Sequence, residues 1–149
     1  MKYEASGIIK TTKGEQDLAS RIKIISSGLQ EIIEKFKPHV VAIEKVFVNT
    51  NPQSTLLLGQ ARGAAISAVV MKDMEVFEYT ALQVKKSVVG NGHADKIQVL
   101  TMVQRLLKVS SDLSSDSADA LACAICHVNM SNSLVKLGTG NRMKAGRII

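Results

Sequence analysis

Apolar residues that recur every three or four positions predict a long helix near the start of the chain. In residues 17–37 these positions fall on one helical face, and Pro38 ends the run. They are Leu18, Ile22, Ile25, Leu29, Ile32, Ile33 and Phe36. A second helix is expected to begin at Asn51-Pro52, because proline is well tolerated in a first helical turn. Its face of small residues would let another helix, of the same chain or of a partner, approach closely. The small residues are Gly59, Ala61, Gly63, Ala64, Ala65, Ser67 and Ala68.

Three short segments are predicted to be strands. Residues 40–46 (VVAIEKV) are rich in β-branched residues, which is typical of a buried strand. Residues 75–79 (EVFEY) alternate between polar and apolar side chains. Residues 3–12 (YEASGIIKTT) could also form a strand, followed by a turn at Gly14.

The second half of the chain is predicted to be mainly helical. A loop containing Gly90 and Gly92 leads to a helix over residues 95–109. A polar linker over residues 110–117 precedes a last apolar helix, which starts near Asp116. The positions expected to face inward in the helix over residues 95–109 are Ile97, Leu100, Val103, Leu106 and Leu107. Alternating strands and helices indicate an α/β fold with some parallel pairing.

Length and composition indicate one soluble globular domain in the cytoplasm. Of the 149 residues, 46% are apolar and 21% are charged, which is the balance of a folded domain. No apolar run approaches the length of a membrane span, and the N-terminal residues lack the features of a secretory signal. We expect a domain over residues 1–131 and a basic, flexible tail over residues 132–149.

The net charge fits a partner that carries phosphate groups. Nineteen Lys and Arg residues against thirteen Asp and Glu residues give a net charge of +6. Such a surplus supports nucleic-acid binding through the release of counterions. A merely basic, soluble surface explains the charge equally well, so charge alone leaves both interpretations open.

Two cysteines form a Cys-x-x-Cys-His pattern at Cys123, Cys126 and His127. This pattern is known from covalent haem attachment. It lies in an apolar helical segment (ALACAICHV), where small cysteines pack well, and the chain shows no export signal. We therefore favour a packing role. The sequence has no second Cys or His pair at the spacing of a zinc site.

Three acidic residues are candidates for metal chemistry. Asp116 and Asp119 lie three positions apart at the start of a predicted helix, so both project from nearly the same face. Glu44 lies near the end of a predicted strand, where ligand-binding side chains gather in α/β sheets. Carboxylate oxygens suit Mg²⁺, which can activate water against a phosphate. Helix capping explains the Asp116 and Asp119 pair equally well, so this pair alone does not distinguish a metal site from a helix cap.

Four segments, in this order and spacing, resemble the RuvC family of Holliday-junction resolvases. They are VVAIEKVF, LLLGQARGAAI, VFEYTALQVKKSVVGNGHADKIQV and DSADALACAICH, and the likeness covers nearly the whole chain. The resemblance implies a ribonuclease-H-like mixed sheet flanked by helices. It also implies a homodimer that uses Mg²⁺ or Mn²⁺ to make paired symmetric nicks in four-way DNA junctions, in recombination and repair. Junction-migration helicases would be its partners.

The resemblance assigns roles to six residues. Glu44, Asp116 and Asp119 match acids of the family's metal site. Phe47 matches an aromatic residue that stacks on bases at the junction centre, although core packing explains it as well. The resemblance identifies the helix after Pro52 as the dimer helix. It also places two lysines near the scissile phosphate, although an ordinary exposed surface position explains them as well. The two lysines are Lys85 and Lys96.

One part of the family pattern is missing from this sequence. The family begins with a strand that bears the first catalytic aspartate, whereas this sequence starts at what resembles the third strand. No aspartate precedes Asp17, which lies at the approach to a helix. We therefore expect the chain as written to be inactive or nearly so. The alternative to an endonuclease is a catalytically inactive, junction-binding remnant.

Overall fold

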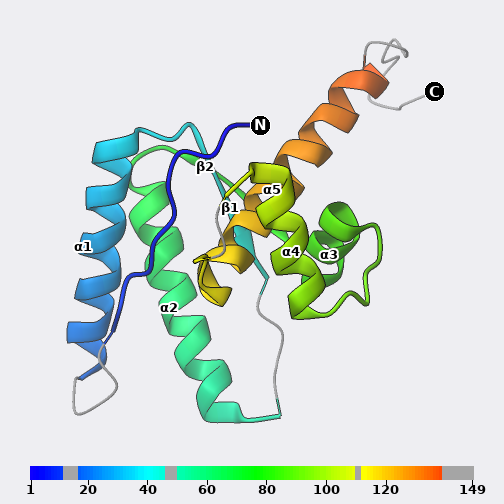
Figure 1. The fold of residues 1–149 in the computed structure, drawn as a ribbon. Coiled ribbons are helices and arrows are strands. Elements are labelled where there is room, and N and C mark those ends of the chain that lie inside the picture. Colours follow the sequence, from blue (N-terminus) through cyan, green and yellow to red (C-terminus); the bar gives the residue numbers. More distant parts are fainter. Residues whose placement is uncertain (12–16, 46–49, 110–111, 139–149) are drawn as a thin grey trace, which may run out of the picture. The chain divides into compact units, whose positions relative to one another are not determined.

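The computed structural model describes residues 1–11, 17–45, 50–109 and 112–138 and divides the chain into two compact units. The strand unit consists of Ala5–Thr80, and the helical unit consists of Met1–Glu4 with Ala81–Ile149. Figure 1 colours the described residues in sequence order, from blue at the N-terminus through green and yellow to orange at the end of α5. No helix among the described residues is long and apolar enough to span a lipid bilayer.

The strand unit is a β-α-β motif preceded by a helix. Its elements are α1 (Leu18–Phe36), β1 (Val40–Glu44), α2 (Pro52–Val70) and β2 (Glu75–Tyr79). The two strands pair in parallel, from Val40 opposite Glu75 to Glu44 opposite Tyr79. Parallel strands need a long crossover connection, which α2 supplies. The sequence predicted all four elements, and the predicted α/β architecture is confirmed.

Both helices of the strand unit begin at capping residues. The Asp17 side chain accepts a hydrogen bond from the Ser20 amide at 2.9 Å, and Asn51 accepts one from the Gln53 amide at 3.0 Å. Such caps satisfy amide groups that have no partner inside the helix. At the other end of α1, Lys37 adopts a left-handed conformation with a φ of 45°.

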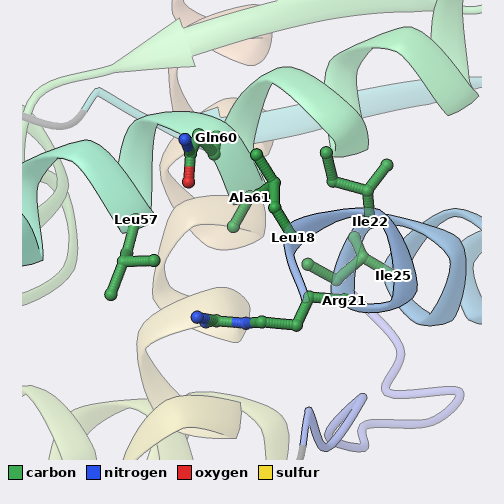
Figure 2. A pocket seen from close by; sticks show the side chains of 7 residues that line it. All are labelled: Leu18, Arg21, Ile22, Ile25, Leu57, Gln60 and Ala61. Atoms are coloured by element: carbon green, nitrogen blue, oxygen red, sulfur yellow. The ribbon is translucent and has the colours of Figure 1, made fainter. Parts of the chain in front are cut away.

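α1 and α2 pack against each other through apolar side chains. Figure 2 shows Ile22 and Ile25 on the side of α1 that faces α2, with Ala61 opposite them. The small Ala61 side chain lets the two helices approach closely, as the small-residue face of the sequence predicted. In contrast, a Cβ atom added at Gly59 or Gly63 would meet no described atom within 4 Å, so this part of the face is open within the described chain.

The strand predicted over residues 3–12 is wrong. The structure assigns no strand to residues 1–11, and residues 12–16, with the predicted turn at Gly14, lie outside the described residues. Ile9 instead packs on α1, where its side-chain atoms would come within 3.0 to 3.2 Å of a Cβ atom added at Gly28. An extended segment becomes a strand only when a neighbouring strand takes its main-chain hydrogen bonds. β1 has β2 as its only strand partner among the described residues.

The helical unit contains α3 (Ala81–Val89), α4 (Lys96–Leu107) and α5 (Ser115–Gly138). The sequence predicted α4 and α5 but missed α3, although Val84 and Val88 are four positions apart and both are buried. In α4 the predicted inward face is partly wrong. Ile97 is 75% exposed and Leu106 is 40% exposed, whereas Val99 and Val103 are buried.

α5 forms the centre of the helical unit and is longer than the sequence predicted. It continues to Gly138, so residues 132–138 of the expected tail are helical, and residues 139–149 lie outside the described residues. Cys123, Ile125 and Cys126 are buried, and both cysteines are free thiols. Burial among apolar neighbours supports the packing role that we favoured for the cysteines.

We predict that the Cys126 thiol is unreactive in the folded protein. Burial raises its pKa above the ordinary value, so less of the reactive thiolate is present. In a Cys123→Ala variant, which leaves Cys126 as the only thiol, reaction with a disulfide reagent should be slow in buffer and fast in guanidinium. Fast reaction in the native state would contradict this prediction.

The same shift predicts how stability depends on pH. Because the folded state keeps the proton to a higher pH than the unfolded state, the contribution of Cys126 to stability is complete below the ordinary thiol pKa and is lost as the pH rises through the higher pKa of the folded state. Urea unfolding of the wild type and of Cys126→Ala should therefore show a stability difference that shrinks at alkaline pH. A stability difference that stays constant with pH would count against a raised pKa of Cys126.

Candidate metal centre

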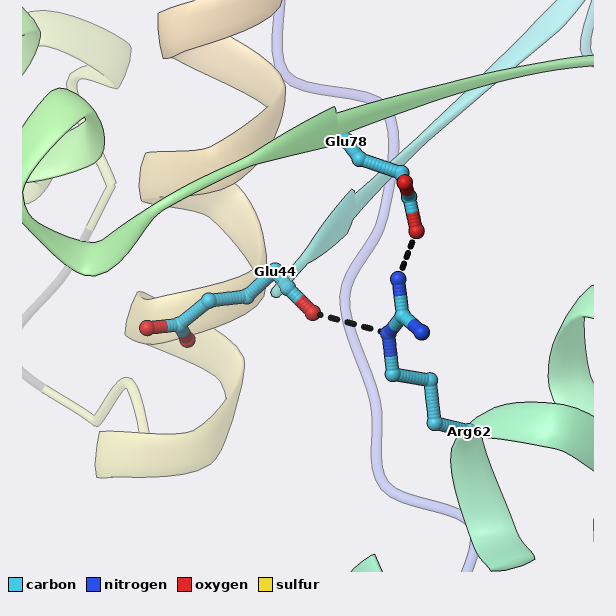
Figure 3. A network of polar contacts seen from close by, with 3 residues as sticks. All are labelled: Glu44, Arg62 and Glu78. Carbon is cyan, nitrogen blue, oxygen red and sulfur yellow. Dashed lines mark hydrogen bonds and ion pairs between the residues drawn. The ribbon is translucent and has the colours of Figure 1, made fainter. Parts of the chain in front are cut away.

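Glu44 is the last residue of β1 and is exposed. Its main-chain carbonyl accepts a hydrogen bond from Arg62 Nε of α2 at 3.3 Å. Arg62 also forms an ion pair with Glu78 of β2. Figure 3 shows the Glu44 carboxylate pointing away from Arg62. The Glu44 side chain therefore projects from the end of the strand on the side that does not face Arg62.

Asp116 and Asp119 lie in the first turns of α5, where the sequence placed them. Ser114, which precedes the helix, takes the capping position: its Oγ accepts a hydrogen bond from the Ser117 amide at 3.2 Å. The Ala118 amide donates to the Ser114 carbonyl at 2.9 Å. Ser114 thus supplies the capping oxygen, and capping does not explain the two aspartates.

The donor atoms of these acids fit a hard divalent cation. Mg²⁺ prefers oxygen ligands and is bound through one or two carboxylates while it keeps several waters. Asp116 is exposed and Asp119 is half-buried, and both lie near the positive end of the α5 dipole. Within each unit, no three described His, Cys, Asp or Glu side chains form a cluster that could hold a metal ion. Glu44 belongs to the strand unit and the aspartates to the helical unit.

The remaining candidates are two lysines and one aromatic residue. Lys85 is half-buried on α3, and Lys96 is exposed as the first residue of α4. Asp95 caps α4 with a capping box, in which its side chain accepts from the Gln98 amide at 2.8 Å. Phe47 lies outside the described residues.

Sequence reasoning missed Arg62 as a residue of this region. The signal was a single cation within the stretch of small residues that follows Leu58. A charged side chain on such a helix needs a partner if it is partly buried. Its two partners, Glu44 and Glu78, lie on the two strands, and only the structure reveals them.

Comparison with known proteins identifies relatives over the whole chain. The family described as crossover junction endodeoxyribonuclease RuvC matches residues 1–127. The RuvC protein of Methylobacillus flagellatus is 59% identical over 154 aligned positions, which cover 100% of this chain and 86% of the relative. The RuvC protein of Azoarcus sp. is 56% identical, with 100% of this chain and 81% of the relative covered.

Solved structures give the same result. Thermus thermophilus RuvC in complex with a Holliday junction substrate superposes with a TM-score of 0.82 and 28% identity, covering 89% of this chain and 80% of that one. A second structure of Thermus thermophilus RuvC gives a TM-score of 0.75 and 30% identity, covering 83% of this chain and 75% of that one. The fold is therefore ribonuclease-H-like, as the sequence predicted. This chain belongs to the RuvC family of crossover junction endodeoxyribonucleases.

Proposed function

We propose that this protein is a metal-dependent endonuclease that resolves Holliday junctions by paired symmetric nicks. The observation that carries the proposal is the start of α5, where Ser114 caps the helix and leaves Asp116 and Asp119 without a capping role. Two acids on nearly the same face of a helix can bind a cation together. Membership of the RuvC family and the junction-bound Thermus thermophilus relative support the same function.

Glu44, Asp116 and Asp119 would hold Mg²⁺ or Mn²⁺. The bound ion would activate water and stabilise the leaving oxygen of a phosphodiester. The three carboxylates themselves supply oxygen ligands and negative charge. Glu44 lies on a strand and the two aspartates lie on a helix, and such elements hold ligand side chains more precisely than loops do.

Two lysines of the helical unit would bind the DNA backbone. Lys96 is a cation at the N-terminal end of α4, a position that the helix dipole disfavours. Helix stability therefore does not explain Lys96, whereas phosphate binding does. Lys85 on α3 would act with it, and Phe47 would stack on unpaired bases.

α2 would form the dimer interface. Leu56 and Leu58 are 62% and 50% exposed, and Gly59 and Gly63 are open within the described chain. Exposed leucines beside small residues suit close packing against a second copy. A two-fold dimer would present two equal sites to a junction with two-fold symmetry. Junction-migration helicases would be its partners in the cytoplasm.

The competing function is junction binding without cleavage. A remnant of this kind would bind junctions through its basic surface. The net charge of +6 supports binding in either case, so only a cleavage assay distinguishes the two functions.

We predict metal-dependent nicking of an end-labelled four-way junction. The Methylobacillus flagellatus relative, which is 59% identical to this chain, serves as the positive control. Asp119→Asn keeps the size of the side chain but removes its charge and should lower the rate by about a hundredfold. The matched control is Asp112→Asn, at an exposed position before α5, which should nick like the wild type.

Two outcomes would count against the nuclease proposal. If a folded protein binds junctions but makes no nicks with Mg²⁺ or Mn²⁺, the binding remnant is favoured. If nicking persists in EDTA or survives Asp119→Asn unchanged, the carboxylates do not hold the catalytic ion.

We also predict that Lys85→Ala with Lys96→Ala weakens junction binding at every DNA sequence. Each phosphate contact removed should lower the slope of log affinity against log salt by about 1. Lys72→Ala is the matched control, because Lys72 Nζ lies 3.5 Å from Glu34 Oε1 in an exposed pair of the strand unit. Titrations of a labelled junction at several salt concentrations measure the slope. An unchanged slope in the double variant would exclude these lysines as phosphate ligands.

A further inference from the structure

Arg62 joins three elements of the strand unit at the carboxyl end of β1. From α2, its Nε donates to the Glu44 carbonyl at 3.3 Å, and its Nη2 pairs with the Glu78 carboxylate of β2. The Arg62 side chain is 25% exposed and the Glu78 side chain is 39% exposed. One guanidinium thus holds a main-chain oxygen and a carboxylate in its planar fork of donors (Figure 3).

This contact lies where the pairing of the two strands ends. Glu44 is opposite Tyr79 in the register, and the Lys45 amide donates to the Tyr79 carbonyl at 2.8 Å. A strand end is held by few main-chain bonds and opens more easily than its middle. The bond from Arg62 adds a charge-assisted contact at this point, and such contacts are stronger than neutral hydrogen bonds.

The register also separates the two glutamates. Residues opposite each other in a paired register project to the same face of a sheet, and successive residues project to opposite faces. Glu78 is opposite Ile43, whereas Glu44 is opposite Tyr79. Glu78 therefore lies on the face that Arg62 reaches, and the Glu44 carboxylate lies on the other face, as Figure 3 shows.

We propose that Arg62 is a positioning residue for Glu44. It fixes the main chain at Glu44 while Glu78 keeps the guanidinium on the opposite face, away from the Glu44 carboxylate. The carboxylate is then held in a defined direction without being neutralised by Arg62. The inference rests on the proposed function, since the value of this arrangement is that Glu44 can serve as a metal ligand.

A purely structural role for Arg62 would have a different effect. An ion pair that only attached α2 to the sheet would contribute little to stability, as partly exposed pairs do, and its loss would speed amide exchange slightly throughout the strand unit. A positioning role predicts a local change at the end of β1. Site-resolved hydrogen exchange separates the two, because it reports the opening of single amides.

The test compares amide exchange in the wild type, Arg62→Met, Glu78→Gln and Arg105→Met. Arg62→Met keeps a long side chain but removes the donors, and it should speed exchange of the Lys45 amide about tenfold. Exchange of the amide of Val69, a buried residue of α2, should not change. Glu78→Gln keeps an acceptor oxygen and should give a smaller effect. Arg105→Met removes an exposed arginine of α4 and should match the wild type.

Unchanged Lys45 exchange in Arg62→Met would overturn the proposal, as would equally faster exchange at Lys45 and Val69. If Arg62→Met fails to fold, Glu78→Gln decides by the same readout, and faster exchange at Lys45 alone supports the proposal. None of these measurements needs nuclease activity.

A Mn²⁺ titration followed by water-proton relaxation tests the link to the metal. Arg62→Met should weaken Mn²⁺ binding about tenfold, and Arg105→Met should leave it unchanged. Faster Lys45 exchange with unaltered Mn²⁺ binding would overturn the role of Arg62 in directing the carboxylate. A wild type that binds no Mn²⁺ would count against the proposed function instead, and the exchange data would still decide whether Arg62 positions Glu44.

Discussion

The main-chain hydrogen bonds between β1 and β2 determine how the strand unit presents its polar side chains. Their register places Glu44 opposite Tyr79 and Ile43 opposite Glu78, so the two glutamates face opposite sides of the sheet. A shift of one residue would reverse this arrangement, because side chains alternate along a strand. α2 connects the strands, and Arg62 of that helix then reaches only one of the two carboxylates.

The helical unit contributes its acids in a different way. Asp116 and Asp119 belong to one helix, α5, which Ser114 caps. The apolar residues Ile125 and Cys126 of this helix are buried. The packed helix thus fixes where the two aspartates lie relative to each other. Of the three carboxylates that the sequence analysis proposed, one lies at the end of a strand in the strand unit and two lie at the start of a helix in the helical unit.

Local patterns made much of the fold predictable from the sequence. The steps of three and four in α1 and the alternation in β2 reflect local geometry, and both elements were found. α3 was missed because nine residues give only a brief periodic signal. The strand over residues 3–12 failed because strand formation depends on a partner elsewhere in the chain. The burial of Val99 in place of Ile97 likewise depends on which neighbours α4 meets.

The candidate site was predictable to a similar extent. The acids could be named from residue type and spacing, and the resemblance to the RuvC family gave them roles. Capping by Ser114, which removes the alternative explanation for the aspartates, could not be foreseen, because it depends on the residue at which α5 begins. The bond from Arg62 to Glu44 joins positions 18 residues apart and required the packing of α2 on the sheet.

The helical setting of Asp116 and Asp119 has a consequence for ionic size. Two carboxylates on adjacent turns cannot move apart without unwinding the helix, so their spacing adapts only through side-chain rotation. Mg²⁺ binds oxygen at about 2.0–2.1 Å, and Ca²⁺ needs about 2.3–2.6 Å and more ligands. A site built on these aspartates would therefore accommodate a larger ion only by rotation of the two side chains. Discrimination between ions of different radius would then depend on the rotamers of two side chains and not on movement of the main chain.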